Sequence, residues 1–155
     1  MGSSLFRRVL GHFATGVTVV TAVHSAQPVG LTCQAFAALS LDPPLVLLAP
    51  SRRSTSWPRA QAAGTFCVNV LAETQEGLAR TFARSGGHKF IGVDWRLGGA
   101  GAPVLAGVAA WVECRLGAVH NGGDHLIVVG QVVDLGVGEG RPLLFYRGGY
   151  GRFED

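Results

Sequence analysis

Apolar and β-branched residues gather in short segments bounded by turn residues, a pattern typical of β-strands. These segments predict strands over 17–23, 29–39, 45–49, 66–71, 108–119, 124–135 and 143–146. The segment 17–23 is rich in Val and Thr and 45–49 is continuously apolar, as expected of a central strand, whereas 66–71 and 108–119 show the two-residue alternation of apolar and polar residues. The alternation is clearest in 108–119, where Val112 and Cys114 fall on one side and Glu113 and Arg115 on the other. We expect 29–39 to be one continuous strand that ends at Asp42-Pro43-Pro44, because two prolines stop a strand.

Three shorter segments carry helical signals instead. Ser3 or Ser4 can cap a first helix, whose apolar face includes Leu5 and Val9 and reaches Phe13, and Gly16 is expected to end it. Further helices are predicted over 57–63 and 74–84. A long glycine-rich connection, 85–103, then follows, and connections of this length are more often functional than idle.

Strands therefore outnumber helices, and most of them are joined by turns of hairpin size such as Asn121-Gly122-Gly123. This order predicts a mainly β protein, in which an antiparallel sheet closes into a barrel with a few peripheral helices. The chain has no internal repeat and no linker-like segment, so we expect residues 1–155 to form a single domain.

Composition narrows the classes of function. Hydrophobic residues make up 48% of the chain and charged residues 15%, which favours a large core and some apolar surface covered by a second subunit. The net charge of +3 comes with scattered arginines, so a nucleic-acid partner is not expected. Cys33, Cys67 and Cys114 lack the spacing of a disulfide framework or a zinc site, and no metal is expected. With no leader or membrane span in the pattern, we expect a cytoplasmic protein without a membrane partner.

Polar residues interrupt the apolar segment 29–39. Thr32, Cys33 and Gln34 stand where a buried strand is expected, and an unpaired buried polar group costs about 1–3 kcal/mol. A flat ligand with a polar edge, such as a flavin ring, would satisfy them. Neighbouring backbone groups would satisfy them equally well, and the local sequence does not decide between the two.

A phosphate site is indicated one strand later. The chain has neither a dinucleotide-binding glycine motif nor a P-loop, but Ser51–Ser56 lies between a strand end and a helix start, where hydroxyls and free N–H groups suit an anion. Arg52 or Arg53 would add charge-assisted bonds. The alternative is an ordinary helix cap with solvated arginines.

Two further places carry candidate binding residues. Arg84 and Lys89 flank a Gly86-Gly87 pair and could grip a pyrophosphate, although an exposed flexible loop has the same pattern. His125 follows a tight turn and could contact a nicotinamide, although a lone histidine is more often structural. Neither a catalytic triad nor a carboxylate pair is present in the pattern.

Taken together, these segments resemble the short-chain flavin reductases of two-component monooxygenases, the flavin-reductase-like branch of the FMN-binding split barrels. The resemblance spans almost the whole chain, and the motifs stand in the order of the family. They are 13–21 (FATGVTVVT), 30–36 (GLTCQAF), 40–44 (SLDPP), 51–55 (SRRST), 66–71 (FCVNVL), 82–83 (FA), 89–90 (KF), 123–125 (GDH), 142–146 (PLLFY) and 149–150 (GY).

The resemblance implies an antiparallel, Greek-key split β-barrel that forms a homodimer and binds FAD or FMN near the dimer interface. It implies that the ring edge is lined by Thr32, Cys33, Gln34 and Ala35, that the phosphate is held by Ser51, Arg52, Ser54 and Thr55, and that the remaining phosphate or adenylate contacts come from Ala83, Arg84, Lys89 and Phe90. His125 and Tyr150 would lie on the nicotinamide side. Relatives usually carry a small Ser or Ala where this chain has Cys33.

The implied activity is that of an NAD(P)H:flavin oxidoreductase. NADH or NADPH would pass a hydride to flavin N5, the protein would contribute alignment rather than acid–base catalysis, and the reduced flavin would be released to a partner monooxygenase. Two alternatives stay open at this point: a flavin- or haem-binding split-barrel protein without reductase activity, acting in storage or sensing, and a plain structural dimer.

Overall fold

The computed structural model describes residues 1–155 and contains twelve strands and three helices. The helices are α1 (Ser3–Leu10), α2 (Trp57–Ala63) and α3 (Glu76–Phe82). The strands are β1 (Thr15–Gly16), β2 (Thr18–His24), β3 (Gln27–Cys33), β4 (Phe36–Ser40), β5 (Leu45–Leu48), β6 (Thr65–Val70), β7 (Trp95–Leu97), β8 (Pro103–Leu105), β9 (Ala110–Gly122), β10 (His125–Val137), β11 (Leu143–Tyr146) and β12 (Gly149–Arg152).

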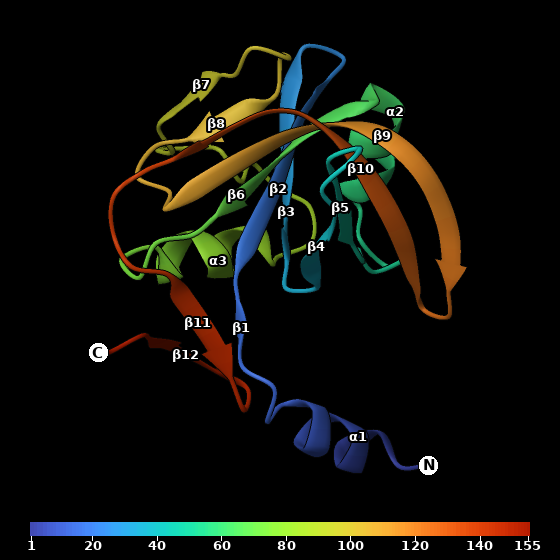
Figure 1. Cartoon of the computed structure of the whole chain (residues 1–155), viewed down its shortest axis with the longest axis vertical. Coiled ribbons are helices and arrows are strands. Elements are labelled where there is room, and N and C mark those ends of the chain that lie inside the picture. Colours follow the sequence, from blue (N-terminus) through green and yellow to red (C-terminus); the bar gives the residue numbers. More distant parts are fainter.

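Seven strands form the main sheet, in the order β3-β2-β6-β9-β10-β5-β4 (Figure 1). Two smaller sheets, β1-β11-β12 and β7-β8, complete the β structure, and all the pairings are antiparallel. The predicted mainly β, antiparallel architecture with a few peripheral helices is therefore confirmed.

The central strands β2 and β6 are buried on both faces of the sheet, and this explains why they are so apolar. In β2, Val20 packs into a cluster that contains Trp57 of α2 and Phe66 of β6. Its neighbour Val19 points to the opposite face and packs in a second cluster that contains Phe82 of α3. Each fully buried side chain of this size contributes roughly 1.5–3 kcal/mol to folding. The two clusters fix α2 and α3 against the strands that end at the site described below.

The long β9–β10 hairpin is the most extended element of the molecule. Its turn runs through Gly123, whose φ of +71° is readily adopted only by glycine. The hairpin curls away from the centre of the sheet (Figure 1), and its closed end lies beyond the pairing of β10 with β5, which covers only Val128–Gln131. The predicted hairpin at Asn121-Gly122-Gly123 is confirmed.

Two predictions about element boundaries are wrong. Helix α1 ends at Leu10 rather than continuing to Gly16: the N–H of Gly11 donates to the carbonyl of Arg7 and closes the last helical turn, and the chain then enters β1. The single strand expected over 29–39 is divided into β3 and β4, which pair with different partners, β2 and β5. The short strands β7, β8 and β12 were not anticipated.

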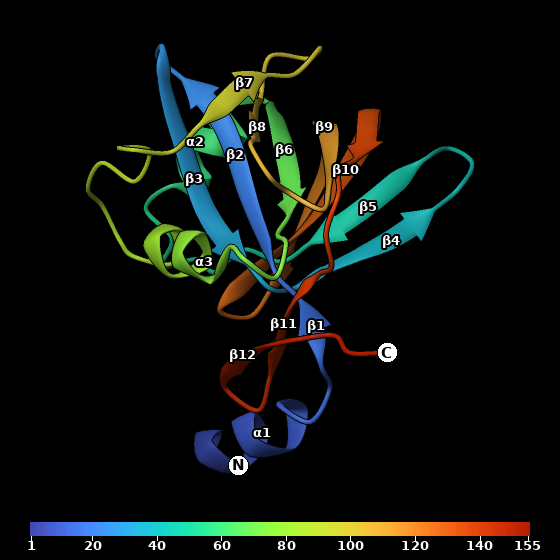
Figure 2. The ribbon, with the colours of Figure 1, turned by 90° about the vertical axis from the view of Figure 1, so that its left-hand side faces the viewer.

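Two apolar elements project from the body of the molecule. Helix α1 buries none of its residues, although it carries Leu5, Phe6, Val9 and Leu10. Figure 2 shows α1 and the β4–β5 hairpin extending in different directions from the sheet. No helix has the length and apolarity that crossing a bilayer requires.

Candidate functional site

Two connected hollows form a groove along the ends of β3 and β5. The larger has a volume of about 420 Å³ and is lined by residues that include Cys33, Ala35 and His125. The smaller, of about 200 Å³, is lined by residues that include Ser54 and Arg84. Thr32 and Ser51 belong to the walls of both hollows, so the two volumes are parts of one groove. We call them the ring hollow and the phosphate hollow.

The groove passes the end of β3, where the sequence places its polar interruption. Thr32 donates its hydroxyl proton to the carbonyl of Ala79 in α3 at 2.6 Å, and Gln34 donates an amide proton to Thr15 Oγ1 at 2.9 Å. The protein itself therefore satisfies these side chains, so of the two alternatives that the sequence left open, satisfaction by protein groups holds for Thr32 and Gln34. The reason is that β3 ends at Cys33, so that Gln34 is exposed rather than inside a buried strand.

Cys33 is buried beside the ring hollow. Its thiol donates to the carbonyl of Ala35 at 3.4 Å, and desolvation raises its pKa to about 11, an effect that the backbone at Ala49 and Ala35 only partly offsets. The thiolate is the reactive form of cysteine, and it is scarcely populated near neutral pH. Cys33 lines the wall of the ring hollow, and its raised pKa disfavours thiolate chemistry near neutral pH.

The phosphate hollow gathers the predicted hydroxyls. Ser51 Oγ accepts the N–H of Arg53 at 3.1 Å, Ser54 Oγ accepts the N–H of Trp57 at 3.0 Å, and Thr55 Oγ1 accepts the N–H of Gly86 at 3.3 Å. In each case the hydroxyl acts as an acceptor, so its own proton remains available to an anion. These bonds also hold the three side chains in place before any ligand arrives.

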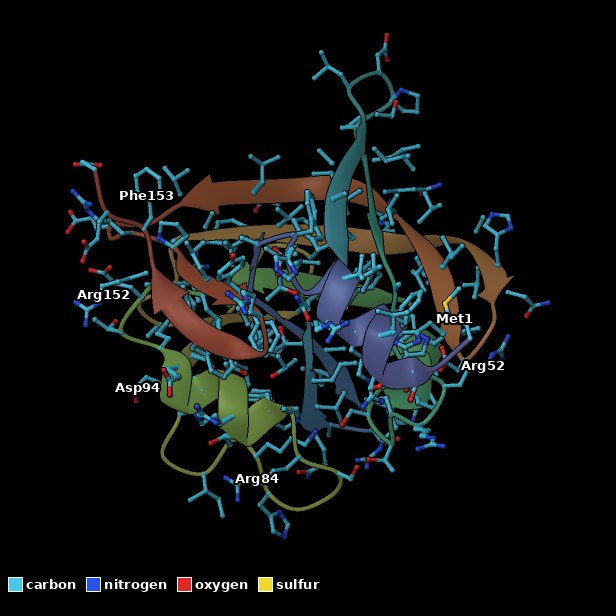
Figure 3. All side chains as sticks on the ribbon, turned by 90° about the horizontal axis from the view of Figure 1, so that it is seen from below. Met1, Arg52, Arg84, Asp94, Arg152 and Phe153 are labelled. Carbon is cyan, nitrogen blue, oxygen red and sulfur yellow. The ribbon has the colours of Figure 1, made fainter.

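The two neighbouring arginines of this loop have different surroundings. Arg53 lines the phosphate hollow together with Arg84. Arg52 points to the other side, where it donates to the carbonyl of Gly123 at 2.9 Å and to Asn121 Oδ1 at 2.6 Å. Figure 3 shows Arg52 near the end of the β9–β10 hairpin and Arg84 at a separate edge of the molecule. The sequence could not distinguish Arg52 from Arg53, and the structure turns Arg53 toward the hollow.

Lys89 is the only lysine of the chain, and its ammonium group is fully engaged by the protein. Nζ donates to the carbonyl of Gly30 at 3.0 Å, to Ser56 Oγ at 3.2 Å and to the carbonyl of Phe82 at 3.2 Å. Partial burial, followed by the charges of Arg59 and Arg84, lowers the pKa of Lys89. Its charge lies beside the hollow, but its three protons are already used.

The other residues expected near the phosphates lie on the same loop. Ala83 lines the phosphate hollow. Phe90 instead borders a neighbouring cavity of about 510 Å³ and stacks edge-on against Phe82, with ring centroids 4.9 Å apart. Ser85 also lines the phosphate hollow, and Phe13 and Thr15 line the ring hollow; sequence reasoning did not assign these three to the site.

His125 faces the groove from the hairpin. It forms a β-bridge with Ser51, and its Nδ1 lies 2.8 Å from Asp124 Oδ1. The hydrogen bond and the charge of His125 hold the pKa of Asp124 below its usual range. Tyr150 is not brought to this groove within the chain, since it packs against Phe145 and lies under the guanidinium of Arg80.

Acid–base and metal chemistry have few candidate groups here. The one fully buried carboxylate, Glu113, accepts the backbone N–H groups of Ala100 and Ala102 and so fastens a loop away from the groove. The structure brings together no group of three or more His, Cys, Asp or Glu side chains that could hold a metal ion. What the groove offers is an apolar wall, hydroxyl donors and cations, and this donor set fits a planar ring that carries a phosphate.

Comparison with known proteins identifies the fold and the family. Residues 10–154 match the family model described as flavin reductase like domain. The reductase subunit HsaB of a flavin-dependent monooxygenase from Mycobacterium tuberculosis is 50% identical over 94% of this chain and 79% of its own length. The FMN reductase (NADH) SmoA of Agrobacterium fabrum is 44% identical over 97% of this chain and 86% of its own.

A solved structure extends the likeness to three dimensions. The NADH:FAD oxidoreductase SgcE6 of Streptomyces globisporus, in complex with NAD and FAD fragments, superposes with a TM-score of 0.91 at 41% identity, covering 97% of this chain and 92% of that one. The predicted split-barrel architecture is confirmed by this superposition. The chain belongs to the flavin reductase like domain family.

Proposed function

We propose that this protein is the reductase component of a two-component monooxygenase, which reduces FAD or FMN with NADH or NADPH and passes the reduced flavin to its partner oxygenase. The observation that carries the proposal is the continuous groove, in which the ring hollow and the phosphate hollow share Thr32 and Ser51 and are faced by His125. The relatives include an FMN reductase (NADH) and an NADH:FAD oxidoreductase, and this supports reduction over mere storage or sensing.

Different residues of the groove would contact the ring and the phosphate of the flavin. Cys33, Gln34 and Ala35 would border the ring, with Phe36 and Pro50 completing an apolar wall. Ser51, Ser54 and Thr55 would donate to the phosphate, and Arg53 and Arg84 would neutralise its charge. The sequence assigned Arg52 and Lys89 to phosphate binding. Arg52 instead contacts the hairpin, and Lys89 holds its own loop, so their contacts support a positioning role rather than direct binding of the ligand.

When bound, a flavin would supply the acceptor for a hydride, that is two electrons and one proton, from the reduced nicotinamide, and this chemistry would need no protein base. The task of the chain is therefore alignment. We place His125 on the nicotinamide side, where it lines the ring hollow and its bond with Asp124 holds Nδ1 toward the carboxylate, which leaves Nε2 without a protein partner. Tyr150 does not line the groove of its own chain, so it would contact a nicotinamide only outside that groove.

We also propose a homodimer of this one-domain chain. Exposed Leu5, Phe6 and Val9 on α1, with Leu135 and Val137 on β10, supply apolar surface of the kind that subunit interfaces cover. Changing Phe6 and Val9 together to Glu is expected to give a monomer by sedimentation analysis, and an unchanged sedimentation coefficient would speak against this face. The three free cysteines fit a reducing, cytoplasmic location.

The experiment that tests the function mixes the purified protein with FAD or FMN and with NADH or NADPH, and follows the nicotinamide absorbance. Flavin-dependent oxidation is expected, and folded protein that gives none with any of the four combinations would overturn the proposal.

A second measurement tests the phosphate hollow. The double variant Ser51→Ala, Thr55→Ala should weaken the binding of FMN by about tenfold or more, because two hydrogen bonds to a charged group are lost. Riboflavin, which lacks the phosphate, should bind almost as before. Equal losses for both ligands would show that these hydroxyls do not hold the phosphate.

A further inference from the structure

The closed end of the β9–β10 hairpin has little support from the sheet. On one edge, β9 pairs with β6 only as far as Arg115, and on the other edge β10 pairs with β5 only from Val128. Between these limits the ribbon consists of two strands, which are marginally stable when isolated. Yet this ribbon carries His125, which must keep a fixed position if it is to face the groove.

The segment 50–52 supplies the missing support. The N–H of Leu126 donates to the carbonyl of Pro50 and the N–H of Arg52 donates to the carbonyl of Asp124, both at 3.0 Å. Ser51 bridges His125 between these two bonds. The main chain of this segment thus acts as a short third strand beside the hairpin.

The side chain of Arg52 extends this support to the turn itself. Nε donates to the carbonyl of Gly123 at 2.9 Å, and one terminal nitrogen donates to Asn121 Oδ1 at 2.6 Å. A planar guanidinium can make both bonds in one fixed geometry, and a lysine ammonium cannot. Arg52 therefore clasps the turn by its backbone and by a side chain.

The same segment builds the phosphate hollow. Ser51 and Arg53, on either side of Arg52, both line that hollow. Three consecutive residues thus face two directions, two toward the phosphate and one toward the hairpin. A change in the position of this segment must move both the phosphate donors and His125.

We infer that Arg52 is a positioning residue that couples the phosphate hollow to the nicotinamide side of the groove. By clasping the hairpin turn, it fixes His125 relative to Ser51 and Arg53, so that a flavin phosphate held by the loop and a nicotinamide met by the hairpin are aligned with each other. This role rests on the proposed reductase function and differs from the direct phosphate contact that the sequence suggested.

The test compares Arg52→Ala with Arg53→Ala in steady-state kinetics with FMN and with riboflavin. For Arg52→Ala we expect kcat/KM for NADH to fall about three- to tenfold with either flavin, while the ratio of FMN to riboflavin affinity changes less than about twofold. For Arg53→Ala we expect the ratio of FMN to riboflavin affinity to fall instead, because Arg53 lines the phosphate hollow. Arg115→Ala, an exposed arginine farther along β9, is the matched control for loss of charge.

Two more variants separate the clasp from a general loss of structure. Asn121→Ala should reproduce part of the defect of Arg52→Ala, and the double variant should be no worse than Arg52→Ala alone. Arg52→Lys should restore little of the activity lost in Arg52→Ala, because lysine keeps the positive charge but lacks the planar pair of N–H donors of the guanidinium. Additive effects, or full rescue by lysine, would contradict the clasp.

Hydrogen exchange tests the coupling without turnover. In the wild type, FMN should slow amide exchange in residues 119–127, and in Arg52→Ala that protection should be lost. Unchanged protection and kinetics in Arg52→Ala would overturn the inference, and so would a defect confined to FMN affinity. A wild type that binds FMN with hairpin protection yet oxidises no NADH or NADPH would instead refute the proposed function.

Discussion

Replacing Lys89 by Met tests whether this lysine holds its loop in place or contacts the ligand directly. Methionine keeps much of the length and apolar character of the side chain but removes all three donors, which now hold Gly30, Ser56 and Phe82. If each bond contributes a net 0.5–1.5 kcal/mol, the three together give roughly 1.5–4.5 kcal/mol. The cost of partly burying the ammonium reduces this sum, so we expect a loss of about 2 kcal/mol.

For a chain of this length a loss of that size lowers Tm by about 4–8 °C, which differential scanning calorimetry resolves readily. Arg115→Met, a surface change on β9, is the control and should stay within about 0.5 kcal/mol of the wild type. Flavin binding should also weaken, because the loop that presents Arg84 and holds Gly86 against Thr55 loses its anchor.

The contrary result is equally definite. Suppose that Lys89→Met has the same Tm as the wild type, while its affinity for FMN falls more than about tenfold and its affinity for riboflavin is kept. The ammonium would then contact the phosphate directly. The three hydrogen bonds would then not be the reason for the position of Lys89.

Three further predictions concern the walls of the groove. Cys33, with a pKa of about 11, should react with iodoacetamide at pH 8 roughly a hundredfold more slowly than in the unfolded chain, and Cys33→Ser should keep kcat within about twofold; rapid alkylation that abolishes activity would contradict both. Gly30→Ala should destabilise the protein by about 1–3 kcal/mol in urea unfolding, because the new Cβ would lie 2.7 Å from the ring of buried Phe82, and a neutral effect would mean that the ring can move. The carboxyl of Asp124 should titrate by NMR below the ordinary aspartate pKa and return to it in His125→Ala; since its folded pKa is lowered, its small contribution to stability is present above the ordinary value and is lost as pH falls through the lowered one.

Most of the fold could be predicted from the sequence, because its strands are defined by local alternation and by turn residues. The hairpin at Asn121-Gly122-Gly123 and helix α2 are examples in which the deciding signals lie within a few residues. The break between β3 and β4 is of another kind. Apolar residues continue across Gln34 and Ala35, and only the separate partners of the two strands reveal a corner. Strands β7 and β12 span only three and four residues, too few for periodicity to detect, and each pairs with a strand that lies a few residues away along the chain.

In the candidate site, too, local sequence signals could be predicted and contacts between distant segments could not. Hydroxyls between a strand and a helix indicate an anion site by their residue types alone, and Ser51, Ser54 and Thr55 do lie together. Which of Arg52 and Arg53 faces that site depends on the register of one short bridge with His125. The engagement of Lys89 depends on two carbonyls and a hydroxyl from β3, α3 and the start of α2, which no local pattern can bring together.

The arrangement of these polar groups bears on how such a groove can align a ligand and still release it. Hydride transfer demands accurate placement, whereas release demands that few interactions be made with the flavin itself. In this structure many of the polar bonds around the groove run from protein to protein: the hydroxyls of the phosphate hollow accept backbone N–H groups, Lys89 ties the loop, and Arg52 ties the hairpin. These bonds order the site before the ligand arrives, so the ligand does not have to meet that entropic cost on binding. A small number of contacts to the flavin can then position it well and let it leave, which is the behaviour that a reductase supplying a separate oxygenase requires.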